Sequence, residues 1–194
     1  MTRLGVPTLE DWELVRQWRN ECLESLRTPF PLTYEQQQEH YRNVVCNREA
    51  RARWWTVLDE FPEVGNAMVG AVGLENIEWE NGRAEISLIV DPHLKRKGFG
   101  REAVKLVLEQ AFNHLRLYSV YGECYDCSPA REFWQKIVES YSPHWDRTRP
   151  SVKYRNGEYH GSYLFTFFTP ATWLGISPWN EKPGVVNDVA PGGG

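Results

Sequence analysis

Two glycines, Gly98 and Gly100, stand one residue apart after a run of basic residues, and their spacing suggests a binding site for phosphate groups. Glycine lets the backbone approach a ligand closely and adopt angles that other residues avoid. The first N–H groups of a helix have no partner inside the helix, so they can point at an anion. Positive charge comes from four neighbours, Lys95, Arg96, Lys97 and Arg101. Together these features predict a site that holds a pyrophosphate.

The glycine pair alone is equally compatible with a tight turn among solvated lysines. A dinucleotide-binding fingerprint needs a third glycine, and a nucleotidase-type phosphate loop needs Gly-Lys-Ser/Thr; the sequence completes neither pattern. The order of the flanking segments strengthens the prediction. A strand-like run over 83–90 ends at Asp91-Pro92, and the basic loop and the glycines follow before an amphipathic helix over 102–115.

The composition is that of one globular domain, with 41% hydrophobic and 25% charged residues in 194. The net charge of -4 disfavours a nucleic-acid partner, because no excess of positive charge would drive counterion release. The apolar runs are too short to span a bilayer, and the first thirty residues lack a secretory signal. We therefore expect a cytoplasmic protein with no membrane partner.

Four cysteines are too few for a disulfide scaffold in a chain of this length. Cys124 and Cys127 form a Cys-x-x-Cys pair, but neither a second pair nor paired histidines complete a tetrahedral site. We expect buried thiols and no metal.

The predicted elements describe an α/β fold with a mixed sheet. Helices are expected to begin at Thr8, Thr33, Glu102 and Ser128, and strands over 3–6, 53–59, 67–77, 83–90, 118–125 and 163–169. The strands on either side of helix 102–115 should be parallel and joined by a right-handed crossover. Proline and glycine are frequent from Gly175 onward, so we expect a domain over 1–174 and a flexible tail over 175–194.

The segment Lys95-Arg96-Lys97-Gly98-Phe99-Gly100 resembles the acetyl-CoA-binding signature of the GCN5-related N-acetyltransferases (GNATs), Arg/Gln-x-x-Gly-x-Gly/Ala, with Lys95 in the first place. From about Arg3 to Trp173, the chain resembles the branch of ribosomal-protein N-terminal and spermidine acetyltransferases. Three further segments carry this resemblance: Trp18-Arg19-Asn20, Ala84-Glu85-Ile86 and the run from Tyr154 to His160. It implies the GNAT fold, a mostly antiparallel sheet with one parallel strand–helix–strand unit and helices on both faces.

The resemblance also implies an acyltransferase that moves acetyl from acetyl-CoA, its cosubstrate, directly to a primary amine of a small molecule or a peptide N-terminus. A homodimer is compatible with it. The implied substrate-binding residues are Trp18, Arg19 and Asn20. The implied acetyl-CoA contacts are Lys95, Arg96, Lys97, Gly98, Phe99, Gly100, Arg101 and Cys127, with backbone groups of Leu88, Ile89 and Val90, where the family splays this strand from the next.

Amine acetylation needs a group that removes a proton, because the ammonium of a lysine-type amine has a pKa near ~10.4 and only the neutral amine attacks. We expect Glu85 to act as this base, with Glu123 on the neighbouring strand as the second candidate. Each of these two residues is equally compatible with a solvated carboxylate on a strand that has no catalytic role. Tyr125 is a candidate acid. No Gly-x-Ser-x-Gly pattern is present, which favours direct transfer over an acetyl-enzyme.

Two departures from the family pattern leave a second function open. Cys127 stands where the family has Asn, and Trp134 stands where it often has the Tyr proposed to protonate the leaving thiol. The alternative is a degenerate member that binds CoA or a partner without turnover. We expect Trp134 to pack in the core, since it lies on the apolar face of its helix.

Overall fold

The computed structural model describes residues 1–63, 65–141 and 145–170. Within these ranges, seven strands form one sheet in the order β1-β2-β3-β4-β5-β7-β6. The strands are β1 (Arg3–Gly5), β2 (Arg53–Phe61), β3 (Gly65–Glu78), β4 (Arg83–Val90), β5 (Ser119–Tyr125), β6 (Trp145–Arg155) and β7 (Glu158–Phe168). Strands β4 and β5 are parallel, and the other neighbours are antiparallel. The predicted α/β fold class is confirmed.

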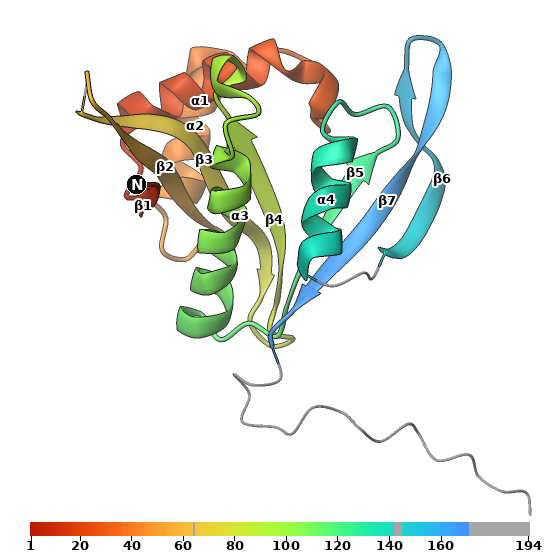
Figure 1. Ribbon diagram of the computed structural model, residues 1–194. Coiled ribbons are helices and arrows are strands. Elements are labelled where there is room, and N and C mark those ends of the chain that lie inside the picture. The colour runs from red at the N-terminus through yellow and green to blue at the C-terminus, as the bar shows by residue number, and fades with distance from the viewer. Residues whose placement is uncertain (64, 142–144, 171–194) are drawn as a thin grey trace, which may run out of the picture.

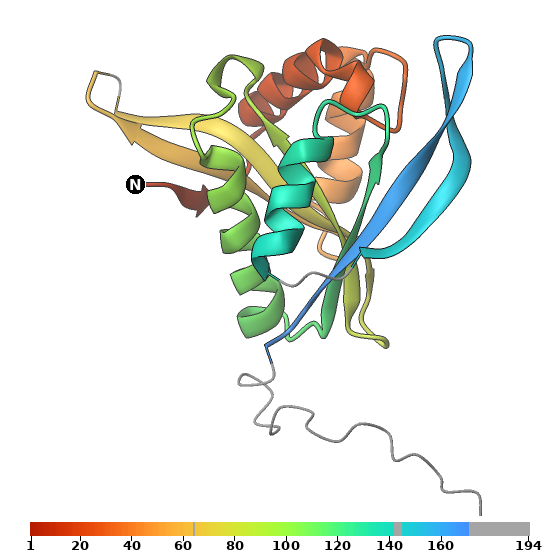
Figure 2. The same ribbon diagram turned by 45° about the vertical axis from the view of Figure 1, so that its right-hand side comes forward.

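Helices cover both faces of the sheet (Figures 1 and 2). The helices α1 (Leu9–Glu21) and α2 (Tyr34–His40) lie on one face, and α3 (Phe99–Glu109) and α4 (Arg131–Tyr141) on the other. Thr8 and Thr33, two of the predicted helix starts, each form a capping box with the residue three positions later. Short helical turns extend or link these helices: η1 (Leu23–Ser25), η2 (Tyr41–Val45), η3 (Pro92–Leu94) and η4 (Gln110–His114).

The sheet separates two apolar clusters, and the alternation of side chains along each strand decides which residue joins which. The larger cluster lies under α3 and α4 and includes Ala84 and Ile86 of β4. The smaller one lies under α1 and includes Ile89 of β4. Glu85, between Ala84 and Ile86, therefore faces the α1 side, as does Glu123 of β5, whose neighbour Cys124 belongs to the larger cluster.

The C-terminal hairpin differs from the prediction. The Asn156-Gly157 pair predicts a hairpin turn, and β6 and β7 meet there, but no bounds were predicted for β6, and β7 begins at Glu158 rather than at Tyr163. A proline inside β6 hides the strand pattern, and the pairing with β7 shifts register between Arg149 and Lys153, where Ser151 has a φ of 55°. The predicted tail over 175–194 lies outside the described residues. In the part of the chain that is described, no helix is long and apolar enough to cross a membrane.

Candidate active site

Strands β4 and β5 separate partway along their length. They pair from Arg83–Ser119 to Glu85–Tyr121, and beyond these pairs they diverge (Figure 1). The other edge of β4 stays paired to β3 as far as Val90. The predicted thioester contacts, Leu88, Ile89 and Val90, lie in the diverging half. Their backbone edge toward β5 is therefore not occupied by that strand, which makes it available to an extended ligand.

The glycine loop leads directly into α3, whose first helical residue is Phe99 rather than the predicted Glu102. The earlier start follows from Gly98, which caps the helix at a φ of 90° and accepts the first helical hydrogen bond from the Glu102 amide at 3.2 Å. A side chain at Gly98 would meet open space among the described residues, whereas a β-carbon at Gly100 would lie 3.1 Å from the Phe133 ring. Gly98 thus shapes the helix entrance, and Gly100 allows α4 to pack against it.

The predicted phosphate-binding groups gather around this helix start. The amides of Phe99, Gly100 and Arg101 occupy the first turn of α3, where N–H groups have no acceptor within the helix. The side chains of the basic residues are exposed around them: Lys95, Arg96, Lys97 and Arg101. This arrangement suits a pyrophosphate by charge and by donor geometry.

A cavity of about 410 Å³ opens beside the split between the strands, on the α1 side of the sheet. It contains all three predicted catalytic residues, Glu85, Glu123 and Tyr125. Its complete lining is Arg27, Glu85, Tyr121, Glu123, Tyr125, Arg149, Val152 and Leu164. Glu85 is the last β4 residue that pairs with β5, so the cavity and the split meet at this carboxylate.

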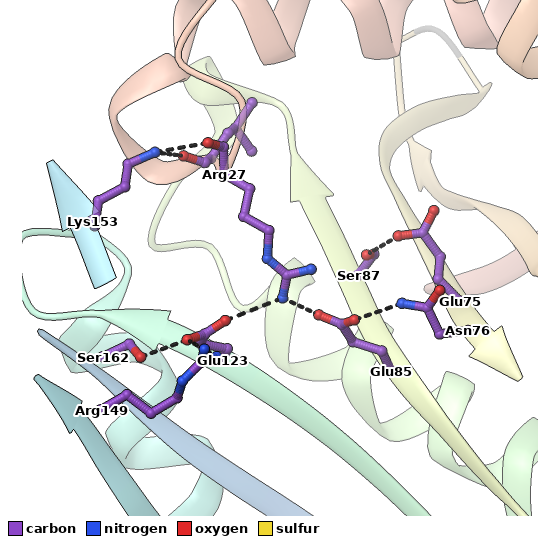
Figure 3. A network of polar contacts seen from close by, with 10 residues as sticks. Arg27, Glu75, Asn76, Glu85, Ser87, Glu123, Arg149, Lys153 and Ser162 are labelled. Carbon is purple, nitrogen blue, oxygen red and sulfur yellow. Dashed lines mark hydrogen bonds and ion pairs between the residues drawn. The ribbon is translucent and has the colours of Figure 1, made fainter. Parts of the chain in front are cut away.

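Arg27 links the two carboxylates (Figure 3). Its Nη2 forms an ion pair with Glu85 Oε1 and lies 3.5 Å from Glu123 Oε2. The second oxygen of Glu85 accepts a hydrogen bond from Asn76 Nδ2 at 2.9 Å. The Glu85 side chain is only 10% exposed, and both of its oxygens have a partner in the protein.

Glu123 is held by β6 and β7. Its Oε1 accepts hydrogen bonds from Ser162 Oγ at 2.5 Å and from Arg149 Nη1 at 3.1 Å (Figure 3). The Glu123 side chain is 9% exposed, whereas Arg149 and Arg27 are 52% and 54% exposed. The carboxylates therefore lie at the floor of the cavity, and the two guanidinium groups lie toward its opening.

The two tyrosines of the cavity are phenols that stay protonated near neutral pH. Burial, followed by the charge of Glu123, raises the pKa of Tyr125. Burial, followed by the charge of Glu85, raises the pKa of Tyr121. The ammonium of Lys153 lies 5.2 Å from the Tyr125 ring centre, a cation–π contact. Both phenols can donate a hydrogen bond into the cavity.

Sequence reasoning missed Arg27, which lies between the end of η1 and the start of α2. The segment is fixed from outside by β6, since Lys153 Nζ donates to the carbonyls of Leu26 at 3.0 Å and Arg27 at 2.8 Å. Arg155 adds bonds to the Glu24 carboxylate at 3.2 Å and the Cys127 carbonyl at 2.9 Å. A single arginine in a loop carries no motif, so its partners become visible only in the folded chain.

The predicted substrate-binding residues are not among the residues that line the cavity. Trp18 is 6% exposed and belongs to the smaller core cluster. Asn20 forms two hydrogen bonds with the backbone of Leu32, at 2.8 and 3.0 Å. Burial lowers the pKa of Arg19, whose Nε has no hydrogen-bond partner among the described residues. In this structure Trp18 packs in the core, and Asn20 anchors the end of the segment that carries Arg27.

The two departures from the family pattern occupy different environments. The Trp134 ring stacks on Phe165 at 4.9 Å and meets Phe133 edge-on at 5.1 Å, which is a packing role. Cys127 is half-buried, and its carbonyl accepts a hydrogen bond from Arg155.

Burial raises the pKa of Cys124 to about 11, so this thiol stays protonated. The described residues contain no cluster of His, Cys, Asp and Glu suited to a metal ion.

A family model described as an acetyltransferase (GNAT) domain matches residues 3–127. No curated protein gives a significant match. Among solved structures, the spermidine N-acetyltransferase from Vibrio cholerae in complex with CoA and spermine matches with a TM-score of 0.74 at 17% identity, covering 89% of this chain and 98% of that chain. The dodecameric structure of spermidine N-acetyltransferase from the same organism matches with a TM-score of 0.72 at 18% identity, covering 88% and 95%. At these identities the likeness is one of fold.

Proposed function

Since this chain belongs to the GNAT acetyltransferase family, whose model covers residues 3–127, we propose that it transfers acetyl from acetyl-CoA directly to a primary amine. The observation that carries the proposal is the meeting of two features at Glu85. The split between β4 and β5 ends there, and the polar cavity begins there. A thioester lying along β4 and an amine lying in the cavity would approach each other at this residue.

The proposed acetyl-CoA site joins the start of α3 to the diverging half of β4. The pyrophosphate would contact the exposed amides around Gly98 and the basic side chains beside them. The pantetheine arm would lie along Leu88, Ile89 and Val90, using backbone groups that β5 leaves available. Cys127, on the turn between β5 and α4, is proposed as a further acetyl-CoA contact.

The proposed reaction needs one base and one acid. Glu85 accepts a proton from the ammonium, the neutral nitrogen attacks the thioester carbon, and the carbon–sulfur bond breaks as the amide forms. The leaving thiolate takes a proton from an acid or from water, and the second proton that the nitrogen loses as the amide forms returns to that acid or to water. Tyr125 suits the acid role, because its raised pKa keeps the phenol protonated. Glu123 would hold Arg27 in position or act as a second base.

The acceptor is proposed to be a small-molecule amine or a peptide N-terminus, as in the branch of ribosomal-protein N-terminal and spermidine acetyltransferases. The Vibrio cholerae enzyme was solved with spermine, and one of its structures is dodecameric. We propose self-association for this chain as well, with a homodimer as its smallest form. The domain is proposed to span 1–174, followed by a separate tail over 175–194.

The experiment that tests this function is thiol release from acetyl-CoA across a panel of polyamines, aminoglycosides, amino sugars and peptides with free N-termini. An acetylated product and stoichiometric CoA are the expected result. The packed Trp134 and the Cys127 substitution favour one alternative, a protein that binds CoA without turnover. Saturable acetyl-CoA binding with no product from any amine would support that alternative and overturn the transferase.

A further inference from the structure

We infer that Arg27 determines acceptor specificity, and that the cavity takes a primary amine on an uncharged or anionic carrier rather than a polycationic amine. This inference rests on the proposed function, because it concerns the amine that the transferase would acetylate. It is carried by the charges that line the cavity and by the depth at which each one lies.

The charges of the cavity are already balanced by the chain itself. Among its lining residues, two carboxylates face two guanidinium groups: Glu85 pairs with Arg27, and Glu123 pairs with both Arg27 and Arg149. The ammonium that enters gives one proton to Glu85 and then attacks as a neutral amine, so an acceptor with no further positive charge adds no lasting charge to the cavity. A second ammonium on the same molecule would find each carboxylate already paired, and it would lie beside positive charge instead.

The depth at which the charges lie determines which of them the rest of the acceptor molecule meets. The carboxylates are about 10% exposed or less, whereas Arg27 and Arg149 are each about half exposed. An amine that reaches Glu85 therefore has the rest of its molecule beside the two guanidinium groups. Guanidinium groups bind carboxylates and phosphates and repel ammonium groups. An acceptor whose remaining part is neutral is tolerated there, and one whose remaining part is anionic can pair with a guanidinium group.

Arg27 is a fixed part of the cavity rather than a side chain that an incoming cation readily replaces. Lys153 holds the Arg27 carbonyl at 2.8 Å, and Asn20 fixes the far end of the segment through Leu32. Burial opposes the charge of the guanidinium, but its pairing with Glu85 outweighs this and raises the pKa of Arg27. An ammonium that displaced it would have to break this pair and would leave the guanidinium half-buried.

The test compares kcat/KM for matched acceptors in thiol-release assays at one pH. The first set is butylamine, 1,4-diaminobutane and 4-aminobutyrate, and the second is Ala-Ala-Lys amide and Ala-Ala-Glu amide. The wild type should favour butylamine over the diamine, and the Glu peptide over the Lys peptide, by about tenfold or more. In Arg27→Gln, Glu85 loses its cation, so both ratios should move toward the cationic acceptor by about tenfold or more.

The control is Arg51→Gln, which removes an exposed arginine that pairs with Glu80 at 3.5 Å away from the cavity lining. It should leave both ratios unchanged. An unaltered acetyl-CoA-induced rise in Tm verifies that Arg27→Gln is folded. A wild type that prefers the diamine and the Lys peptide, or ratios unmoved in Arg27→Gln, would overturn the inference alone. If neither the wild type nor Arg27→Gln acetylates any acceptor, the proposed function is wrong and this inference fails with it.

Discussion

At the residue scale, the cavity keeps its negative charges deep and its positive charges near solvent. Glu85 and Glu123 are each held by at least two donors that come from different elements. Such donors fix the orientation of the two carboxylates. A carboxylate held in place beside the strand split meets the geometric requirement of a general base, because an amine in the cavity can reach it.

Replacing Glu85 with Gln should lower kcat by about a hundredfold or more, because loss of a general base typically costs that factor. Acetyl-CoA binding should remain nearly intact, since the residue lies outside the phosphate loop. The matched control is Glu75→Gln, which alters the carboxylate opposite Glu85 on β3, bonded to Ser87 at 2.7 Å. The measurement is the pH–rate profile with an accepted amine. Wild-type turnover across the pH range in Glu85→Gln would transfer the role of base to Glu123 or to water.

Replacing Gly98 with Asp should abolish acetyl-CoA binding, because it places a negative charge at the start of α3 and strains a φ of 90°. The readout is the acetyl-CoA-induced rise in Tm, which follows from mass action. Gly157→Asp provides the control, since Gly157 has a φ of 88° and equally open surroundings in the β6–β7 turn. The control should lose stability similarly and still bind. Equal acetyl-CoA affinity in both variants would show that the site lies elsewhere.

At the element scale, α1 and α2 are joined by a polar contact inside an aromatic cluster. Trp12 Nε1 donates to His40 Nδ1 at 3.1 Å, and the two rings stack 5.8 Å apart with an angle of 6°. Trp54 of β2 meets both rings edge-on. His40 must be neutral to accept this bond, and burial lowers the pKa of His40 accordingly.

The free energy of unfolding should therefore fall as the pH drops below about 6.5, the ordinary pKa of histidine. Below that value the unfolded chain binds a proton that the folded chain refuses until its own lower pKa is reached. One such site contributes at most about 1.4 kcal/mol per pH unit. Urea unfolding between pH 7 and 5 measures how steeply the free energy of unfolding depends on pH. This dependence should weaken in His40→Gln and remain in His114→Gln, which changes an exposed histidine. An unchanged dependence in His40→Gln would contradict the role given to His40.

The elements were more predictable from sequence than the site. Strand β4 matches its predicted bounds, because its alternation is uninterrupted and Asp91-Pro92 ends it. The bounds of β6 could not be predicted, although the turn after it was, because the backbone around Ser151 breaks its alternation. Glu85 and Glu123 could be proposed from strand position alone. Their shared partner Arg27 could not, because 58 residues separate it from Glu85 and only the fold brings them together.

At the scale of the whole molecule, removing residues 175–194 should leave the free energy of unfolding within about 0.5 kcal/mol of the full chain. The tail sequence is rich in proline and glycine and has few residues able to form a core. Urea unfolding of a chain that ends at Leu174 makes the comparison. A chain that ends at Arg155 is the control, since it lacks β7 and should not fold. Loss of folding in the longer truncation would mean that the tail is structural.

The strand split divides the sheet into two blocks, β1 to β4 on one side and β5, β7 and β6 on the other. Between the blocks, the ladder runs from Arg83–Ser119 to Glu85–Tyr121 and then opens. Beyond this short ladder, side chains rather than strand pairing join the two blocks, among them Arg27 and the residues of the larger cluster. A pantetheine chain lying between the opened edges would add backbone contacts that the missing ladder does not supply. Substrate loading and the stiffening of the protein would then be one event, visible as slower amide hydrogen exchange on both sides of the opening.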